Sequence, residues 1–395
     1  MKNINEYNYS NKRVLLRLDL NVPVTNNIIL DYSRIDRIIP SIQYLLKQKA
    51  KIVIISHFGR PKSGFESKYS IEFLAKELSS KLAVPVSFCK ETIGKETENL
   101  TNNMLPGEVL LLENLRFHPE EIRNDAAFAS SLAKLADFYI NDAFSCCHRA
   151  HSSIAKITEF LPSAAGLLLM EEIDNLSKHL LPGKKPIMAI VGGSKVSTKL
   201  NLLQNLVKQV DYLVIGGAMA NTFLKAQGAE IGTSLFEEDM LDTAITILHT
   251  KQCKVILPQD VVIADKIEEN SLNSVVNIKN IPSNKMILDI GPDTSSNICQ
   301  LLKNCHTVIM NGPLGVFEFF PFSVGTLTIA REIAKLTREK RLVSIAGGGD
   351  IVAALSKGGL FPQFTYVSTA GGAFLEWLEG KKLPGIEALE KRGNI

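Results

Sequence analysis

The sequence lacks a strong net charge of either sign. Its 395 residues include 44 Lys and Arg and 41 Asp and Glu, which gives a formal net charge of +3 at pH 7. This balance gives no general reason to expect nucleic acid or a membrane surface as a partner. The sequence also lacks an apolar run near the roughly 18 residues of a membrane span, and its polar start, MKNINEYNYSNK, has no apolar core of the signal-peptide type. We therefore expect a cytoplasmic protein without nucleic-acid or membrane partners.

Cysteine is scarce as well. The six cysteines are scattered, lack the spacing of a zinc site and are too few to cross-link a chain of this length. Two of them are adjacent, but no C-x-x-C motif accompanies them, which disfavours a metal or redox role. We expect reduced, mostly buried thiols at Cys89, Cys146, Cys147, Cys253, Cys299 and Cys305.

Two common nucleotide-binding motifs are absent. Neither G-x-x-x-x-G-K-[ST] nor G-x-G-x-x-G occurs, and the protein-kinase signatures are missing too. These absences argue against a P-loop enzyme and against a dinucleotide-binding dehydrogenase.

The sequence does contain a long alternation of short apolar runs with amphipathic segments. Such a pattern is typical of parallel strands joined by crossover helices, and the length suggests two domains. The first half predicts strands at Val14–Leu20, Lys51–Ser56, Val86–Cys89, Val109–Asn114 and Phe138–Asp142. The second half predicts strands at Ile187–Val191, Tyr212–Gly217, Lys254–Pro258, Met286–Gly291, Thr307–Pro313, Leu342–Asp350 and Thr365–Thr369.

A single helix is expected between these two halves, within residues 164–186. Leu169, Ile173, Leu176 and Leu180 recur at helical spacing, and LPGKKP ends the segment. We interpret it as a connector, although it could also be a packing helix inside one domain. The sequence thus predicts an α/β protein with two doubly wound parallel-sheet (Rossmann-like) domains joined by a connector helix and hinge.

Basic residues follow the predicted strands of the first half. Ligands of open parallel sheets bind beyond the carboxyl ends of the strands. Arginine matches phosphate and carboxylate oxygens with paired hydrogen bonds, so several arginines there indicate a small polyanion, while Asp19 and Asn21 would accept from its hydroxyl. Exposed arginines at loop edges are the alternative. The residues are Asp19, Asn21, Arg34, His57, Arg60, Arg116, Arg149 and His151.

The stretch GGSKVSTKL, from Gly192 to Leu200, follows a predicted strand and opens a predicted helix. Glycines allow a close approach of the backbone to a ligand, and free N–H groups at a helix start attract anions. Lys195 and Lys199 are four residues apart, so we expect them on one helix face and on one phosphate. A helix cap with two solvated lysines is the alternative.

Other strand ends of the second half are also rich in glycine. They read GGAMAN, NGPLGVFE, GGGD and TAGGA, beginning at Gly216, Asn311, Gly347 and Thr369. We expect their backbone to press against a nucleotide, with Glu318 near the ribose hydroxyls and Asp350 near a magnesium ion.

These motifs together resemble the phosphoglycerate kinase family. RLDLNVP, SHFGRP, ENLRFHPEE, NDAFSCCHRAHSS, GGSKVSTK, NGPLGVFE, AGGGD and LPGIEAL occur in the family's order over the whole chain. The resemblance implies an N-terminal domain (1–165) for 3-phosphoglycerate or 1,3-bisphosphoglycerate, a connector (166–185) and a C-terminal domain (186–382) for MgADP or MgATP. It also implies that residues 383–395 pack on the N-terminal domain and that the protein is a monomer.

The resemblance assigns roles to individual residues. It implies that Arg34 and Lys199 take part in catalysis and that Asp350 holds Mg²⁺ together with the nucleotide phosphates. The implied substrate-binding residues are Asp19, Leu20, Asn21, Arg34, His57, Phe58, Gly59, Arg60, Arg116 and Arg149. The implied nucleotide-binding residues are Gly192, Gly193, Lys195, Lys199, Gly217, Asn311, Pro313, Glu318, Gly347, Gly348, Gly349 and Asp350.

Some positions depart from the family's usual residues. Ile351 replaces a threonine, which removes one expected phosphate contact, and Thr198 replaces a frequent aspartate, which removes a second metal carboxylate. The other departures are Ser194, Ala218, Met310 and Ala370. None touches the lysines, the arginines or Asp350, so we expect activity.

Two rival functions come from other classes. A two-domain protein that only closes on an anion would share the arginines but would not need nucleotide-shaped glycine loops. A dehydrogenase would need a pyrophosphate-binding fingerprint, which is missing. ATP formation from 1,3-bisphosphoglycerate and ADP discriminates among the three functions.

Overall fold

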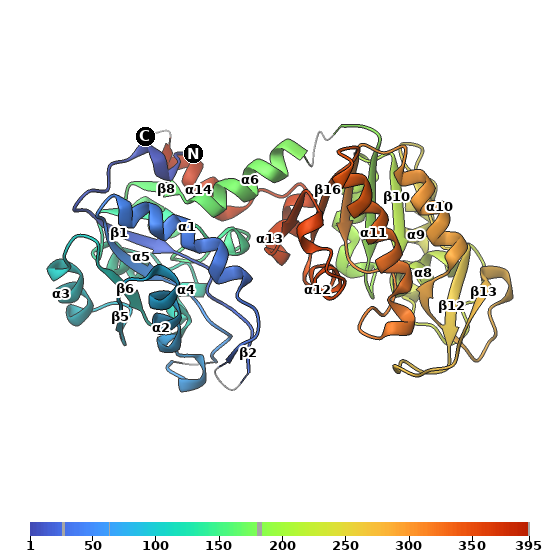
Figure 1. Ribbon diagram of the computed structural model, residues 1–395, viewed down its shortest axis with the longest axis horizontal. Helices are drawn as coiled ribbons and strands as arrows, with labels where there is room; N and C mark the ends of the chain where they lie inside the picture. The colour runs from blue at the N-terminus through green and yellow to red at the C-terminus, as the bar shows by residue number, and fades with distance from the viewer. Residues whose placement is uncertain (26–27, 63, 180–183, 394–395) are drawn as a thin grey trace. The chain divides into compact units, whose positions relative to one another are not determined.

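The computed structural model describes residues 1–25, 28–62, 64–179 and 184–393. The chain forms two compact units (Figure 1). The first comprises Met1–Ile173 and Lys382–Ile395, and the second comprises Asp174–Lys381. The division falls within helix α6 (Leu167–His179), on which Leu169 and Leu176 are buried as their spacing predicted. Leu180, predicted on the same stripe, lies outside the described residues.

The first unit is built on a six-stranded sheet in the order β5-β6-β4-β1-β7-β8. All of its pairings are parallel, which confirms the predicted fold class for this half. The sequence missed β8, a Ser-Ala-Ala segment without β-branched residues. The strands are β1 (Arg13–Arg17), β4 (Lys51–Ile55), β5 (Val86–Cys89), β6 (Val109–Leu112), β7 (Phe138–Asn141) and β8 (Ser163–Ala165), and a separate hairpin pairs β2 (Val24–Thr25) with β3 (Ile28–Ile29).

Helices of the first unit bury apolar stripes in one core with the sheet. Ile35, Ile38 and Ile42 of α1 pack in the same cluster as Leu74 and Leu78 of α2. Residues three or four apart share a helix face, so this is the burial that their spacing predicts. The helices are α1 (Ser33–Lys47), α2 (Glu72–Leu82), α3 (Lys95–Asn103), α4 (Pro119–Ile122), α5 (Ala126–Ala133) and α14 (Pro384–Gly393).

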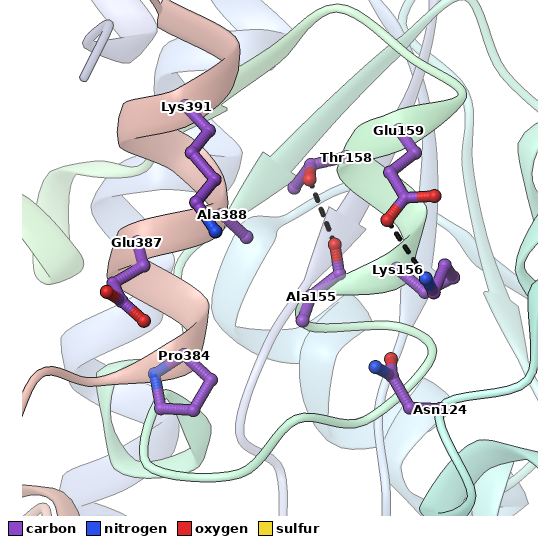
Figure 2. A pocket seen from close by; sticks show the side chains of 9 residues that line it. All are labelled: Asn124, Ala155, Lys156, Thr158, Glu159, Pro384, Glu387, Ala388 and Lys391. Atoms are coloured by element: carbon purple, nitrogen blue, oxygen red, sulfur yellow. Dashed lines mark hydrogen bonds and ion pairs between the residues drawn. The ribbon is translucent and has the colours of Figure 1, made fainter.

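Helix α14, at the end of the chain, packs on this first unit. It contacts β8, and the N–H of Gly385 donates to the carbonyl of Cys147 at 2.9 Å. Figure 2 shows a cavity of about 300 Å³ between α14 and the short 3-10 helix η5 (Lys156–Glu159), where Lys156 pairs with Glu159 at 2.9 Å. No residue that the sequence predicted to bind substrate or nucleotide lines this cavity.

The second unit has its own six-stranded parallel sheet, in the order β11-β10-β9-β15-β16-β17. Its strands confirm six of the seven predicted in this half, and β9, β15 and β16 carry buried side chains on both faces. They are β9 (Ile187–Gly192), β10 (Tyr212–Gly216), β11 (Lys254–Ile256), β15 (Thr307–Asn311), β16 (Val343–Gly347) and β17 (Tyr366–Ser368). The helices are α7 (Leu200–Leu206), α8 (Ala218–Ala226), α9 (Leu241–Leu248), α10 (Pro292–Leu302), α11 (Val324–Arg338), α12 (Gly349–Lys357) and α13 (Gly371–Leu378).

The remaining predicted strand, Met286–Gly291, does not belong to the parallel sheet. Met286–Ile290 is β14, which joins β12 (Asp260–Ala264) and β13 (Asn273–Asn277) in a three-stranded sheet. Both pairings of β12 are antiparallel. An apolar run predicts a strand but does not state its partner, and the exposed β13 gives almost no apolar signal.

Among the described residues, no helix combines the length and apolar composition needed to cross a membrane.

Candidate functional site

Each parallel sheet has one point at which the direction of strand addition reverses. In the first unit this point lies between β1 and β7, and in the second unit it lies between β9 and β15. Ligands of open α/β sheets bind outside the carboxyl ends of strands at such switch points. Most of the predicted site residues follow strands that end at these two edges.

In the first unit, Asp19 organises the switch point. It follows β1, is 8% exposed and accepts hydrogen bonds from Arg34 Nη1 at 2.8 Å and from the N–H of Asn21 at 3.1 Å. Its carboxylate also accepts from the hydroxyl of Ser145, which follows β7. Burial alone would raise the pKa of Asp19, but Arg34 and these hydrogen bonds lower it. Asp19 is therefore an ionised carboxylate that fixes Arg34 in place.

The loops after β1, β4 and β6 are hydrogen-bonded to one another. The side chain of Asn21 accepts from the N–H of Gly59 at 2.9 Å, and the side chain of Asn114 accepts from the N–H of Phe58 at 3.1 Å. Arg116 donates to the carbonyl of Gly59. Gly59 has φ +60°, and a Cβ there would come within 2.3 Å of the Tyr69 ring, so only glycine fits this turn.

Buried Arg17 is a member of the site that the sequence did not predict. It is 1% exposed, donates to the Ser153 hydroxyl at 3.0 Å and places Nη2 3.2 Å from Nδ1 of His57. Burial lowers the pKa of His57 well below its usual range, and the guanidinium groups of Arg17, Arg116 and Arg34 lower it further. His57 is therefore neutral, and arginines carry the positive charge of this edge.

Arg149 and Arg60 lie at the surface of the same unit. Both are exposed, and Arg149 donates from Nε to His148 at 3.0 Å. Burial is the main cause that lowers the pKa of Arg116, and the positive charge of Arg149 lowers it further. The structure thus brings Arg34, Arg116 and Arg149 together with Arg17, while Arg60 follows Gly59 as an exposed neighbour.

One buried group in this unit has metal-ligand chemistry. The ligand atoms of Asp19, His57 and Cys146 lie within 4.8 Å of one another. However, Arg17 Nη2 lies 3.7 Å from the Cys146 sulfur and also contacts His57. The positive charge of Arg17 therefore already lies beside two of these three ligand atoms. All six cysteines are free, and all except the half-buried Cys299 are buried, as predicted.

In the second unit, Lys199 bridges the two strands of the switch point. Its Nζ donates to the carbonyl of Gly192 at 2.5 Å, to the carbonyl of Asn311 at 3.0 Å and to the side-chain oxygen of Asn311 at 2.7 Å. These bonds use all three donors of an ammonium group. Burial lowers the pKa of Lys199 to about 8, although Asp350 opposes the shift.

Lys195 and Lys199 do not share a helix face, so that prediction is wrong. After β9 the chain passes through a bend to the 3-10 helix η6 (Ser197–Lys199), and α7 begins only at Leu200. Lys195 precedes the helix and is exposed. No helix begins at Ser194, because η6 starts only at Ser197, whose N–H donates to Glu237 at 3.0 Å.

The glycines of this edge are needed because loops of the protein itself approach one another. A Cβ on Gly192 would lie 1.7 Å from the carbonyl of Pro313, and one on Gly217, at φ +67°, would lie 2.7 Å from the carbonyl of Gly193. Asn311 donates to the carbonyl of Gly347 at 2.6 Å, and a Cβ on Gly348 would meet Asn311 at 3.0 Å. We predicted that these glycines press against a ligand, and a Cβ would meet no atom within 4 Å at Gly349 and at Gly371 of the TAGGA loop.

A cavity of about 530 Å³ opens beside these loops and is lined entirely by the second unit. Five predicted nucleotide-binding residues line it: Gly193, Gly217, Pro313, Glu318 and Asp350. Leu235, Val261, Met286, Leu288 and Val316 give it an apolar wall. An apolar slot of this volume with a few polar groups is typical of a small-molecule site.

Three carboxylates line this cavity, those of Asp289, Glu318 and Asp350. Asp350 is exposed in the first turn of α12, where it is free to meet a cation held by phosphate oxygens. Glu318 is exposed, while its backbone carbonyl accepts from Lys357 at 3.0 Å. Asp289, which the sequence did not predict, is buried and accepts from the N–H of Gly325 at 2.8 Å, and burial raises its pKa to about 7.

The positions that depart from the family pattern fall into three groups. Ser194 and Ala218 line the cavity. Met310 and Ile351 are fully buried in the core cluster of this unit. Ala370 is also buried and precedes α13, whereas Thr198 is exposed and donates to the carbonyl of Lys195 at 2.9 Å.

The pKa of Lys199 leads to a testable proton balance. A bound phosphate would raise a pKa of about 8, because the nearby negative charge favours the ammonium. ADP binding at pH 8.5 is therefore expected to take up roughly 0.5–0.7 proton, and binding at pH 7 about 0.1. Titration calorimetry in two amine buffers of different ionisation enthalpy measures this uptake. The variant Lys199→Met should lose it, and equal uptake in that variant would place the titrating group elsewhere.

The two units together define a class of protein. One carries an edge lined with arginines, which can bind phosphate or carboxylate groups, and the other a cavity of about 530 Å³ near the half-buried Lys199. Such a pair of sites is typical of a phosphotransferase. A family model described as phosphoglycerate kinase matches residues 4–381. The chain belongs to the phosphoglycerate kinase family.

Individual relatives agree with this assignment. Phosphoglycerate kinase of Methylorubrum extorquens is 47% identical over 385 residues, 97% of this chain and 96% of the relative. That of Rhodospirillum centenum is 46% identical over 391 residues, 98% of this chain and 99% of the relative. Among solved structures, phosphoglycerate kinase from Coxiella burnetii has a TM-score of 0.90 at 43% identity and 99% coverage of both chains. The enzyme from Pyrococcus horikoshii has a TM-score of 0.85 at 28% identity and full coverage of both chains.

Enzymes of this family transfer a phosphoryl group reversibly from 1,3-bisphosphoglycerate to ADP, giving 3-phosphoglycerate and ATP. The chain is accordingly a kinase of this glycolytic reaction.

Proposed function

We propose that the two units divide the substrates between them. The domain of residues 1–165, completed by 383–395, binds the phosphoglycerate through Arg34, Arg116 and Arg149. The domain of residues 186–382 binds ADP or ATP in its cavity and at Lys199. The observation that carries this proposal is that each unit has its own switch point, one rich in arginine and the other in glycine loops around Lys199.

The reaction needs little covalent help from the protein. A β-phosphate oxygen of ADP attacks the phosphorus of the acyl phosphate, the bond from that phosphorus to the carboxyl oxygen breaks, and the carboxylate leaves. No general base is required, because the attacking oxygen is already anionic. Lys199 and Arg34 neutralise the charge that spreads over the equatorial oxygens in the transition state.

Asp350 is the residue that would hold Mg²⁺. Asp350 is an exposed carboxylate that lines the proposed nucleotide cavity. This fits the usual magnesium site, in which one or two carboxylates and the phosphate oxygens of the nucleotide bind the ion. The ion supplies neutralisation of phosphate charge when it is bound with the nucleotide.

Transfer requires both bound substrates to come within reach of each other. Because the proposed sites belong to separate units, we infer a closing motion about the connector (166–185), part of which is α6. Closure would also exclude water, which otherwise hydrolyses the acyl phosphate.

Two further properties belong to this proposal. Six free thiols support a reducing compartment such as the cytoplasm. A monomer is proposed from the family resemblance, and light scattering after size-exclusion chromatography tests it.

Formation of ATP from 1,3-bisphosphoglycerate and ADP, followed with a coupled enzyme assay, tests the activity. We expect ATP to form only when both substrates and Mg²⁺ are present. Binding of the acid without ATP formation would support a binding protein instead, and reduction of a nicotinamide cofactor would support a dehydrogenase.

A further inference from the structure

One loop of the second unit carries two of the predicted nucleotide-binding residues. It covers residues 312–323, between the end of β15 and the start of α11, and contains Pro313 and Glu318. Both residues line the proposed nucleotide cavity. Because Glu318 is exposed, the position of its carboxylate depends on what holds the loop.

Strand β14 contacts this loop and the helix that follows it. The carbonyl of Leu288 accepts from the N–H of Val316 at 2.8 Å. The carboxylate of Asp289 accepts from the N–H of Gly325 at 2.8 Å with one oxygen and from the N–H of Ile290 at 2.9 Å with the other. Gly325 is the second residue of α11, and the free N–H groups at a helix start favour a negative charge. Two adjacent residues of β14 thus hold the middle of the loop and its exit.

The Asp289 carboxylate also occupies the space between two glycines. A Cβ on Gly315 would lie 2.3 Å from Oδ1 of Asp289, and a Cβ on Gly325 would lie 2.7 Å from the same oxygen. Both ends of the segment 315–325 therefore pack directly against one carboxylate. Because Asp289 is only 2% exposed, we expect it to act on a ligand through this segment and not by direct contact.

We propose that Asp289 is a positioning residue for nucleotide binding, which holds the segment 315–325 so that the carboxylate of Glu318 meets the ribose hydroxyls. This inference rests on the proposed function, which places the nucleotide in this cavity. Both oxygens of Asp289 face N–H donors, and an ionised carboxylate only accepts. An asparagine at this position would set its NH₂ group against one of the two N–H groups. The segment would then shift and carry Glu318 with it.

The test is a double-mutant cycle of Asp289→Asn and Glu318→Gln, with kcat and KM measured in the ATP-forming direction. Each single variant is expected to raise KM for ADP by about 10-fold, as for the loss of one hydrogen bond to a charged group, and to change kcat by less than about 3-fold. The double variant should have a KM within about 2-fold of that of Glu318→Gln, because the second change removes nothing further. Asp289→Ala, which has no amide to oppose the N–H groups, replaces the asparagine variant if that variant does not fold.

Asp260→Asn is the matched control. Asp260 is a buried aspartate of the neighbouring strand β12, and its carboxylate accepts from the N–H groups of Thr294 at 2.8 Å and Asp293 at 3.0 Å at the start of α10. It does not line the cavity. Both asparagine variants should therefore have a lower melting temperature than the wild type, whereas KM for ADP should rise only in Asp289→Asn.

Three results would overturn the inference. They are an unchanged KM for ADP in Asp289→Asn, an equal rise in Asp260→Asn, and a double variant in which the two single effects multiply in full. A wild-type enzyme that makes no ATP would refute the proposed function instead. The Kd of ADP, measured by calorimetry for the wild type and the three variants of the cycle, would then still decide whether Asp289 acts through Glu318.

Discussion

Replacing Lys199 by alanine is expected to lower kcat by about 10²-fold or more and to weaken ADP binding by only about 10-fold, the coupling that a rise of about one unit in the pKa of Lys199 on ADP binding implies. The ammonium of Lys199 lies at the switch point of the second sheet, bonded to Gly192 and Asn311. Removing one donor that acts on developing transition-state charge typically costs about 10²–10³ in kcat. Steady-state kinetics with both substrates varied, together with calorimetry of ADP binding, separates the two effects.

Lys195 provides the comparison for this prediction. It lies four residues away but is exposed in a bend before the helix. We expect Lys195→Ala to act mainly on KM for the nucleotide, since an exposed cation contributes to binding in the ground state and the transition state alike. An unchanged kcat in Lys199→Ala would remove Lys199 from the mechanism.

Replacing Arg116 by alanine is expected to weaken 3-phosphoglycerate binding by about 10- to 100-fold and to leave ADP binding intact. A hydrogen bond to a charged group contributes about 1.5–3 kcal/mol, and Arg116 is held at the arginine-lined edge through the carbonyl of Gly59. Binding of each ligand alone can be measured by calorimetry.

Arg123 is the matched control in the same unit. It is an exposed arginine that pairs with Glu120 at 2.8 Å and is not a predicted site residue. Surface pairs of this kind contribute little, so Arg123→Ala should bind both ligands as the wild type does. If Arg116→Ala loses ADP and keeps 3-phosphoglycerate, the roles of the two units are reversed.

Much of the fold could be predicted because parallel strands are buried on both faces. Runs such as Ile187–Gly192 and Thr307–Asn311 are apolar along their whole length and stand out against polar loops. Most of the errors come from segments without that signal, although β12 (Asp260–Ala264) was missed despite being apolar and buried. The short β8 and the exposed β13 were missed, and β14 was placed in the wrong sheet because pairing depends on tertiary contacts.

The residues of the candidate site were predictable where a charged or polar side chain comes at or shortly after the end of a predicted strand. Arg34, Arg116, Lys199 and Asn311 lie at the two edges that the order of the strands defines. Arg17 is the last residue of β1 and stands within the apolar run VLLRLDL, and a charged residue in such a run is the signal that could have revealed it.

The error about Lys195 has a specific cause. Spacing of four residues implies a shared face only if the α-helix already includes both residues. Here a bend and a 3-10 turn precede the helix, and Lys199 turns back toward the sheet. Sequence periodicity does not locate the first residue of a helix to within a turn.

The return of the C-terminal helix to the first unit has a consequence for biosynthesis. When the ribosome has made residues up to Ile173, the surface around Cys147 still lacks α14, whose Gly385 bonds to it. The roughly 200 residues of the second unit must be translated before that helix emerges, which takes about 10–40 s at ordinary elongation rates. The half that begins first is thus completed last, and the nascent chain exposes an unfinished N-terminal core throughout that interval.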